Sequence, residues 1–251
     1  MKENTIINSE EFLKEISVLK TSSIVSWKKA NNKYNFSSLP KTALLTLSPY
    51  AINRKTRFLS KKTKGLIGQN FILNQKVIFC SEFGNGSPAI VGLLEELREL
   101  GVENFIFVGF AGLIDKSAKK NDVFLVNNSF STVGITDFYA VKDNFQPANS
   151  VWFENLKFNL NLPEATCWST DAPYRETKSL VSYFVQKKAT HVDMECAAIY
   201  AFTAFYNLNA LCIIITADDL SNDNWNPPSD VKAMNFNLHQ IIKKLIRYTN
   251  D

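Results

Sequence analysis

The sequence predicts one α/β domain in which helices cover a mostly parallel β-sheet. From Thr42 onward, short apolar runs alternate with segments of helical periodicity, an order typical of parallel sheets with helical connections. Apolar residues make up 45% of the 251 residues and charged residues 21%, so the chain can bury a sizeable core. We expect the domain to span residues 41–251, with residues 1–40 forming an extension packed on it.

Seven apolar runs predict the strands of this sheet. Each run is short and dominated by aliphatic, β-branched or aromatic residues, as in strands that are buried on both faces. The runs are residues 43–47, 76–80, 105–109, 122–126, 165–169, 191–194 and 211–216.

The clearest helix prediction lies between residues 88 and 100. Leucine and isoleucine recur there at helical spacing, while most charged residues fall outside the apolar stripe. Ser87 is expected to cap the N-terminus, Pro88 suits the first turn, and Gly101 suits a left-handed stop. Further helices are predicted at residues 10–18, 175–186, 195–206 and 231–248.

The composition argues against several classes of protein. A net charge of +4, scattered along the chain, does not indicate a nucleic-acid-binding protein. The four cysteines form no CxxC pair, and we interpret them as buried thiols of a cytoplasmic protein. No apolar run reaches membrane-spanning length, and the polar N-terminus lacks the apolar core of a signal peptide. With only two histidines we expect no metal, so carboxylates must carry any acid–base chemistry.

Candidate ligand-binding residues follow the apolar runs, because ligands of open α/β sheets bind beyond the carboxyl ends of the strands. The sequence GNGSP at residues 84–88 follows a strand and opens a helix, where free N–H groups can face an anion. A tight turn is the alternative role. In STDAPYRET, residues 169–177, Tyr174 offers a flat face, and Arg175 with Glu176 forms a charge pair. A solvated turn is an equal alternative for this segment.

Two carboxylates stand at strand ends that we expect to meet. Glu195, in VDMECAA, can bridge two neighbouring hydroxyls, and capping of the following helix is its alternative role. Asp218, in TADDL, follows the most apolar strand beside Asp219, and a loop or cap role is the alternative for either acid. If the sheet is parallel, both strand ends lie at one edge and both carboxylates can face one ligand.

The ordered set GNGSP, VGFAG, STDAPYRE, VDMECAA and TADDL resembles the purine nucleoside phosphorylase and uridine phosphorylase family. The resemblance runs from about Pro40 to the C-terminus, and its specificity lies in five motifs in this order. It implies a three-layer α/β/α fold of the phosphorylase/hydrolase type, with a central mixed, mostly parallel sheet. It also implies a homo-oligomer, such as a dimer or a trimer of dimers, that acts in nucleoside metabolism, for example in purine salvage.

The resemblance also implies roles for individual residues. Glu195 would hold the ribose hydroxyls, and Met194 would pack under the sugar. Asp218 would be the general acid for the departing base. The base itself would lie against Tyr174, Phe110, Ala111 and Gly112. The phosphate site is expected among Ser48, Arg54, Arg57, Gly84, Ser87 and Gly109.

Three departures from the family bear on these roles. Phe107 stands where many relatives have an arginine for phosphate. The early phosphate loop is matched poorly by TLSPYAINRKTR, although residues 54–64 contain six cations and no acid. One of these cations can be recruited to the anion, while a solvated basic loop is the alternative. Pro173 replaces one of the two aromatic residues that line the base in many relatives.

Three functions follow from this comparison. The first is a nucleoside phosphorylase, a pentosyltransferase that uses inorganic phosphate as co-substrate, needs no cofactor, and yields free base and ribose 1-phosphate from a purine or uridine-type nucleoside. The second is a nucleosidase that uses water, favoured by Phe107 and opposed by the lack of any acid between Pro40 and Cys80. The third is a nucleoside-binding protein without turnover. In every case the partners are small molecules, with no nucleic acid and no membrane.

Overall fold

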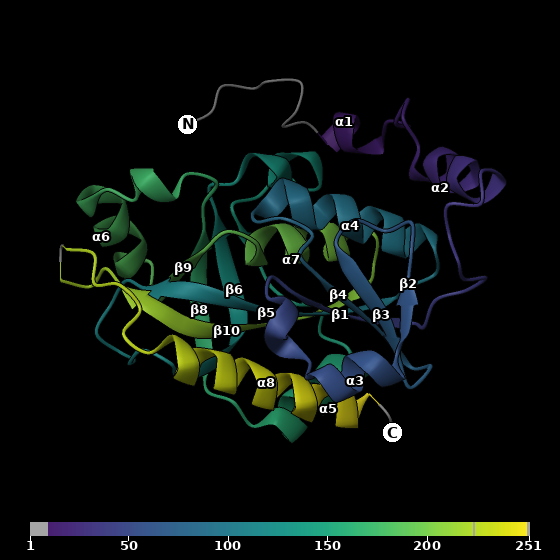
Figure 1. The fold of residues 1–251 in the computed structure, drawn as a ribbon. Coiled ribbons are helices and arrows are strands. Elements are labelled where there is room, and N and C mark those ends of the chain that lie inside the picture. The colour runs from purple at the N-terminus through teal and green to yellow at the C-terminus, as the bar shows by residue number, and fades with distance from the viewer. Residues whose placement is uncertain (1–9, 223, 250–251) are drawn as a thin grey trace.

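The computed structural model describes residues 10–222 and 224–249 and has a mixed α/β fold around a central sheet (Figure 1). Most of the sheet consists of two groups of parallel strands, which run antiparallel to each other where β10 meets β6 and where β5 meets β9. Strands are therefore parallel within each group, and the two groups are joined by antiparallel pairs. The first group is β4 (Val77–Ser81), β1 (Thr42–Thr46), β5 (Asn104–Leu113) and β10 (Asn209–Asp219). The second group is β6 (Val123–Ser131), β8 (Glu164–Ser169) and β9 (His191–Asp193).

Strand β5 joins the two groups because it pairs with β9 and with β10. Gly112, near its end, has Val192 of β9 on one side and Asp218 of β10 on the other. The strands β10, β6, β8, β9 and β5 thereby close into a ring. Beyond β4 the sheet continues with the antiparallel strands β3 (Gln69–Leu73) and β2 (Lys61–Thr63), and β7 (Asn144–Phe145) pairs with β6.

Helices cover both faces of the sheet (Figure 1). On one face, α4 (Ser87–Glu99) and α7 (Cys196–Phe205) bury their apolar sides in the larger core cluster. On the other face, α5 (Val151–Leu160) and α8 (Val231–Tyr248) fill a second cluster, with the short α3 (Arg54–Leu59) nearby in Figure 1. Helix α6 (Lys178–Gln186) lies beside β8, where the ring of Phe184 stacks on Trp168 with their centroids 4.4 Å apart.

The predicted strands and the long helices are present with small shifts of their ends. The predicted helix at residues 10–18 is the shorter α1 (Glu10–Lys14), and the polar stretch that follows contains α2 (Thr21–Ala30). The capping prediction for Ser87 is wrong, because Gly86 precedes the first turn and Ser87 Oγ donates to the carbonyl of Met194 at 2.5 Å. Gly101 does end α4 with a left-handed φ of 93°.

The segment before the sheet contacts α4 through polar side chains. Glu96 Oε1 accepts hydrogen bonds from Lys28 Nζ at 2.6 Å and from the Tyr34 hydroxyl at 2.5 Å. Glu95 accepts one from Thr21 Oγ1 at 3.1 Å. The division into an extension and a domain stays a prediction. Across the described residues, no helix combines the length and apolar character needed to cross a bilayer.

Candidate active site

A cavity of about 740 Å³ lies where the ends of β5, β9 and β10 converge, a size common for small-molecule sites. The structure brings seven of the predicted site residues together around it. They are Phe110, Ala111, Gly112, Tyr174, Met194, Glu195 and Asp218. The premise that the strands end in parallel at one edge is wrong for β9, which runs antiparallel to β5. The two carboxylates share a cavity because Gly112 of β5 has β9 on one side and β10 on the other.

Glu195 stands between the end of β9 and the start of α7 and is only 2% exposed. Its Oε1 accepts the backbone N–H of Gly86 at 2.7 Å, and its side chain makes no capping bond to α7. Burial raises the pKa of the Glu195 carboxyl to about 7, and the nearby charge of Asp193 acts in the same direction. The helix-capping alternative is therefore not the role of this side chain, which is held against the GNGSP turn instead.

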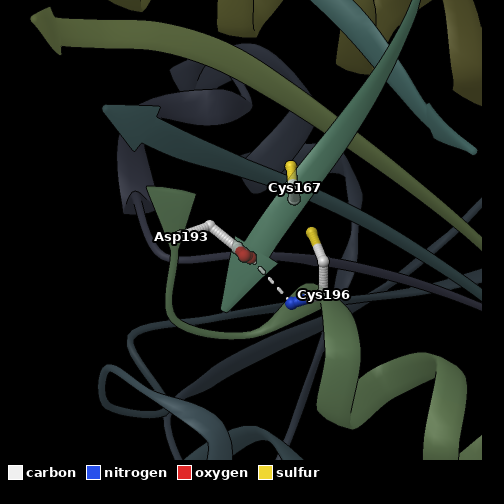
Figure 2. Close-up of side chains that lie close together, drawn as sticks. All are labelled: Cys167, Asp193 and Cys196. Carbon is white, nitrogen blue, oxygen red and sulfur yellow. Dashed lines mark hydrogen bonds between the residues drawn. The ribbon is translucent and has the colours of Figure 1, made fainter. Parts of the chain in front are cut away.

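Asp193 performs the capping that the sequence left open for Glu195. Its Oδ2 accepts the N–H groups of Glu195 at 3.0 Å and Cys196 at 2.7 Å, and its Oδ1 accepts the Ser169 hydroxyl at 2.5 Å. Figure 2 shows the bond to Cys196 beside two thiols, Cys167 on β8 and Cys196 at the start of α7. The side chain of Asp193 thus fixes the backbone N–H groups on both sides of the Glu195 Cα atom.

The two cysteines and Asp193 lie close enough to be considered as a metal site, since their ligand atoms are within 4.8 Å of one another. Both thiols are fully buried, and burial raises their pKa values above the ordinary value for cysteine. Metals bind the thiolate, and both carboxylate oxygens of Asp193 already accept hydrogen bonds. The cluster fits a packed, hydrogen-bonded support beneath the cavity better than a metal centre.

Asp218 lies at the end of β10, half-buried at the other side of Gly112. Its Oδ2 accepts the indole N–H of Trp225 at 2.6 Å. A side chain placed on Gly112 would lie 3.0 Å from Asp218 Oδ1, so the absence of a Cβ there makes room for the carboxylate. The acid is held between an indole donor and the backbone of β5.

Sequence reasoning missed two residues at this end of the cavity. Glu176, predicted as part of a charge pair with Arg175, lines the cavity, and its pKa is raised to about 7 by burial and then by the charge of Asp218. Trp225 also lines the cavity, with 65% of its surface exposed, and it belongs to none of the predicted motifs. Tyr174 is fully exposed and Pro173 lies next to it in the lining. The signal available for Glu176 was its place in STDAPYRET, two residues after Tyr174. The sequence around Trp225 contains no comparable signal.

The residues predicted for phosphate are not among those that line the cavity. Ser48 caps the turn at Pro49–Ala51, and Arg54 is exposed on α3. Arg57 hydrogen-bonds to Gln69 and lies over the Phe71 ring, 5.4 Å from its centroid. Gly84, Ser87 and Gly109 lie near the lining residues Asn85, Met194 and Phe110 without lining the cavity themselves. Their assignment to phosphate stays a prediction.

Phe107 is a core residue of β5, at 1% exposure. It lies between Leu45 of β1 and Cys212 of β10 in the sheet. A Cβ on Gly109 would lie 2.5 Å from its ring, so the ring occupies the space beside this glycine. The position where the family resemblance led us to expect an arginine is filled by apolar packing in this chain.

This fold and cavity define a class: α/β proteins whose mixed sheet presents carboxylates near strand ends to one cavity. The chain belongs to the phosphorylase superfamily, whose model matches residues 61–247. It is 28% identical over 176 residues to the uncharacterized protein R802 of Acanthamoeba polyphaga mimivirus, covering 66% of this chain and 70% of that protein. It is 26% identical over 164 residues to proteins named purine nucleoside phosphorylase DeoD-type from Bacillus cytotoxicus and Brevibacillus brevis, covering 62% of this chain and 70% of each relative.

Proposed function

We propose that this chain cleaves the N-glycosidic bond of a nucleoside with inorganic phosphate, giving a free base and ribose 1-phosphate. The observation that carries the proposal is that Glu195 and Asp218 line one cavity from two different strand ends. Membership of the phosphorylase superfamily and the printed names of the DeoD-type relatives support the same reaction. Those names favour a purine over a uridine-type base.

At the sugar end, the proposed role of Glu195 is to accept hydrogen bonds from ribose hydroxyls. The Gly86 N–H orients Oε1 of this carboxyl and the Met194 backbone also hydrogen-bonds to it, and its remaining lone pairs accept from hydroxyl donors in this proposal. Each charge-assisted contact of this kind contributes about 1.5 to 3 kcal/mol. Met194 lines the cavity beside it and packs under the sugar in this proposal.

At the base end, the proposal places the base against Tyr174, Phe110, Ala111 and Gly112. The C1′–N bond breaks with its electron pair going to the base, and an acid at this end, Asp218 or a neighbour acting with it, supplies the proton that keeps the base neutral. Positioned proton transfer of this kind contributes about 100-fold to 10,000-fold. A phosphate oxygen forms the new bond to C1′.

Hydrolysis is the second candidate, and one observation favours it. No arginine is among the cavity-lining residues of the described chain, and Phe107 is buried in the core. Lys178 lines the cavity but lacks the planar fork with which arginine holds phosphate oxygens, and water needs neither group. A third possibility, binding without turnover, is disfavoured because both proposed carboxylates are present.

The proposal extends to the setting of the reaction. We place the protein in the cytoplasm, in purine salvage or related nucleoside metabolism, without a metal or cofactor. Its partners would be nucleoside, phosphate and further copies of itself in a dimer or a trimer of dimers. Helices on both faces of the sheet support a three-layer α/β/α architecture for residues 41–251.

The test is to incubate the protein with a panel of purine and pyrimidine nucleosides, with and without phosphate, and to identify the sugar product. Phosphate-dependent release of base with ribose 1-phosphate is the expected result. Asp218→Asn should lower kcat by about 100-fold or more, because the base end loses one of its two carboxyl groups and with it the acid–base pair.

The matched control is Asp219→Asn, since Asp219 is adjacent but does not line the cavity and its Oδ1 accepts the N–H of Ser221 at 2.8 Å. This variant should keep turnover within a few-fold. Release of base at the same rate with and without phosphate would reject phosphorolysis and favour hydrolysis. Binding without any release would reject both reactions.

A further inference from the structure

The base end of the cavity holds two carboxyl groups, and they differ in what surrounds them. Asp218 Oδ2 accepts the Trp225 indole N–H at 2.6 Å, so this oxygen is already engaged as a hydrogen-bond acceptor. Glu176 follows the turn Pro173–Arg175 and lines the same cavity, half-buried. Over residues 10–222 and 224–249, no group hydrogen-bonds or pairs with the Glu176 carboxyl. Within the described part of the chain, Asp218 is thus held as an acceptor, and Glu176 has no hydrogen-bonding partner.

Two carboxyl groups that face one small cavity do not ionise independently. The negative charge of the first disfavours that of the second, so a proton stays on the group with less support for its anion. Trp225 donates to the Asp218 carboxylate, whereas no described residue donates a hydrogen bond to the carboxyl of Glu176, although Lys178 lines the same cavity. The asymmetry of the surroundings therefore decides which acid is protonated when substrate arrives.

We propose that Glu176 is the residue that carries the proton to the departing base, and that Trp225 is a positioning residue that keeps Asp218 as the neighbouring hydrogen-bond acceptor. This inference rests on the proposed function and assigns its proton donor. A purine suits the pair, because its ring nitrogens accept a proton while its ring or exocyclic N–H groups donate to a carboxylate. Burial and the charge of Asp218 raise the pKa of Glu176 to about 7, which leaves the proton available at neutral pH.

Each proton that moves during cleavage of the C1′–N bond has a donor and an acceptor. The C1′–N bond breaks with its electron pair moving to the base, while the O–H bond of the Glu176 carboxyl breaks and its proton forms an N–H bond on the base. The attacking phosphate becomes the sugar ester and releases its own proton. That proton, directly or through solvent, restores the Glu176 carboxyl for the next turnover.

The kinetic experiment compares Glu176→Gln, Glu176→Asp and Trp225→Phe across pH. Glu176→Gln should lower kcat by about 100-fold or more and remove the alkaline limb, on which wild-type kcat falls as pH rises through about 7. Glu176→Asp, which keeps a carboxyl, should recover part of kcat and the limb. Trp225→Phe keeps the ring but loses the N–H, so kcat should fall about tenfold and the limb should move to higher pH. The controls are Glu154→Gln on α5 and Trp27→Phe on α2, away from the cavity lining.

A spectroscopic readout separates this inference from the proposed function. Infrared difference spectra of the unliganded protein, from about pH 5 to about pH 9, should contain protonated carboxyl bands that titrate near neutrality. Glu195 contributes one such band and Glu176 the other, so Glu176→Gln should lose only its own. An intact band pattern in that variant, or wild-type kcat and pH profile, would overturn the inference. A wild-type protein that releases no base from any nucleoside would instead reject the proposed function, and with it this role for Glu176.

Discussion

Asp193 orients the site through the backbone around Glu195 and is itself part of the cavity wall. Its two oxygens accept three hydrogen bonds, from Ser169 and from the backbone on either side of Glu195. The peptide that presents Glu195 is therefore fixed by a neighbour two residues away. A side chain that orients a site in this way contributes through the positions of other groups.

At the residue scale, the sequence predicted the cavity-lining carboxylates that follow apolar runs. It missed the cavity-lining residues whose position depends on the course of a loop. Glu195 and Asp218 could be found because strand ends are readable from hydropathy. Trp225 lies seven residues beyond Asp218, and nothing in local patterning says that the loop returns its indole to that acid. Capping of α7 was considered only for Glu195, and local patterning does not distinguish it from Asp193, the acid two positions earlier that accepts the N–H groups.

The buried imidazole of His191 makes the stability of the fold depend on pH. Its ring lies between Thr190 Oγ1 at 2.8 Å and Thr216 Oγ1 at 2.9 Å, and burial lowers its pKa from 6.5 to about 4. The unfolded chain thus gains a proton at a higher pH than the folded chain. The stability that this residue contributes is complete above pH 6.5 and is lost as pH falls toward 4, by up to about 3 kcal/mol.

His191→Gln should lower the free energy of unfolding and flatten its dependence on pH in this range. Urea unfolding midpoints at a series of pH values give the measurement. His239→Gln, on α8, is the control and should retain the wild-type slope. A slope unchanged by His191→Gln would show that other groups govern stability in acid.

At the scale of elements, α4 links two parts of the molecule. The amide of Gly86 at its start binds Glu195, while Glu95 and Glu96 in its third turn bind residues of the N-terminal segment. The helix whose preceding turn holds Glu195 thereby also anchors α2. The long apolar stripe of α4 made this helix predictable, whereas its polar contacts with α2 were not.

Glu96→Ala should detach the N-terminal segment from α4. The variant leaves Lys28 and Tyr34 without their shared acceptor, and we expect a loss of about 1 to 3 kcal/mol and faster protease cleavage between residues 20 and 36. Urea unfolding and limited proteolysis with mass spectrometry measure the two effects. Glu99→Ala, which removes only a 3.7 Å pair with Arg98, is the control and should change neither by much.

Elements with a plain apolar pattern were predicted, and those without one were not. Helix α5 has an N-cap at Ser150, but its sequence VWFENLKFNL mixes aromatic and polar residues and yields no clean stripe. The direction of β9 was also beyond prediction, because a run of three residues carries no signal for parallel or antiparallel pairing. Helix α5 packs against β10 and α8, and β9 pairs with β5 and β8, so both outcomes depend on contacts far apart in the sequence.

At the scale of the whole molecule, the two groups of parallel strands are joined by Tyr200 as well as by the sheet. Its hydroxyl donates to the carbonyl of Val126 at 2.5 Å and accepts the N–H of Cys212 at 3.1 Å. Val126 and Cys212 face each other across the antiparallel junction of β6 and β10. A side chain from α7 is thus inserted into the seam between the groups.

Tyr200→Phe should destabilise the entire fold by about 1 to 3 kcal/mol, because a buried carbonyl and a buried N–H each lose a partner while the ring is kept. The loss should lower the unfolding midpoint without changing the denaturant dependence. Tyr248→Phe, whose hydroxyl lies in the exposed part of α8, is the control and should stay within about 0.5 kcal/mol. Equal losses in the two variants would contradict a special role for the seam.

The packing of Phe107 over Gly109 also constrains the course of mutation at this position. An arginine introduced alone at residue 107 would bring a guanidinium into the core between Leu45 and Cys212, where an unpaired charge costs several kcal/mol. Descendants of this chain would therefore reach a cationic residue here only by changing its neighbours as well. Lineages that acquire an anion-binding cation have an easier route through the mobile tips of surface loops, where a new charge disturbs no packing.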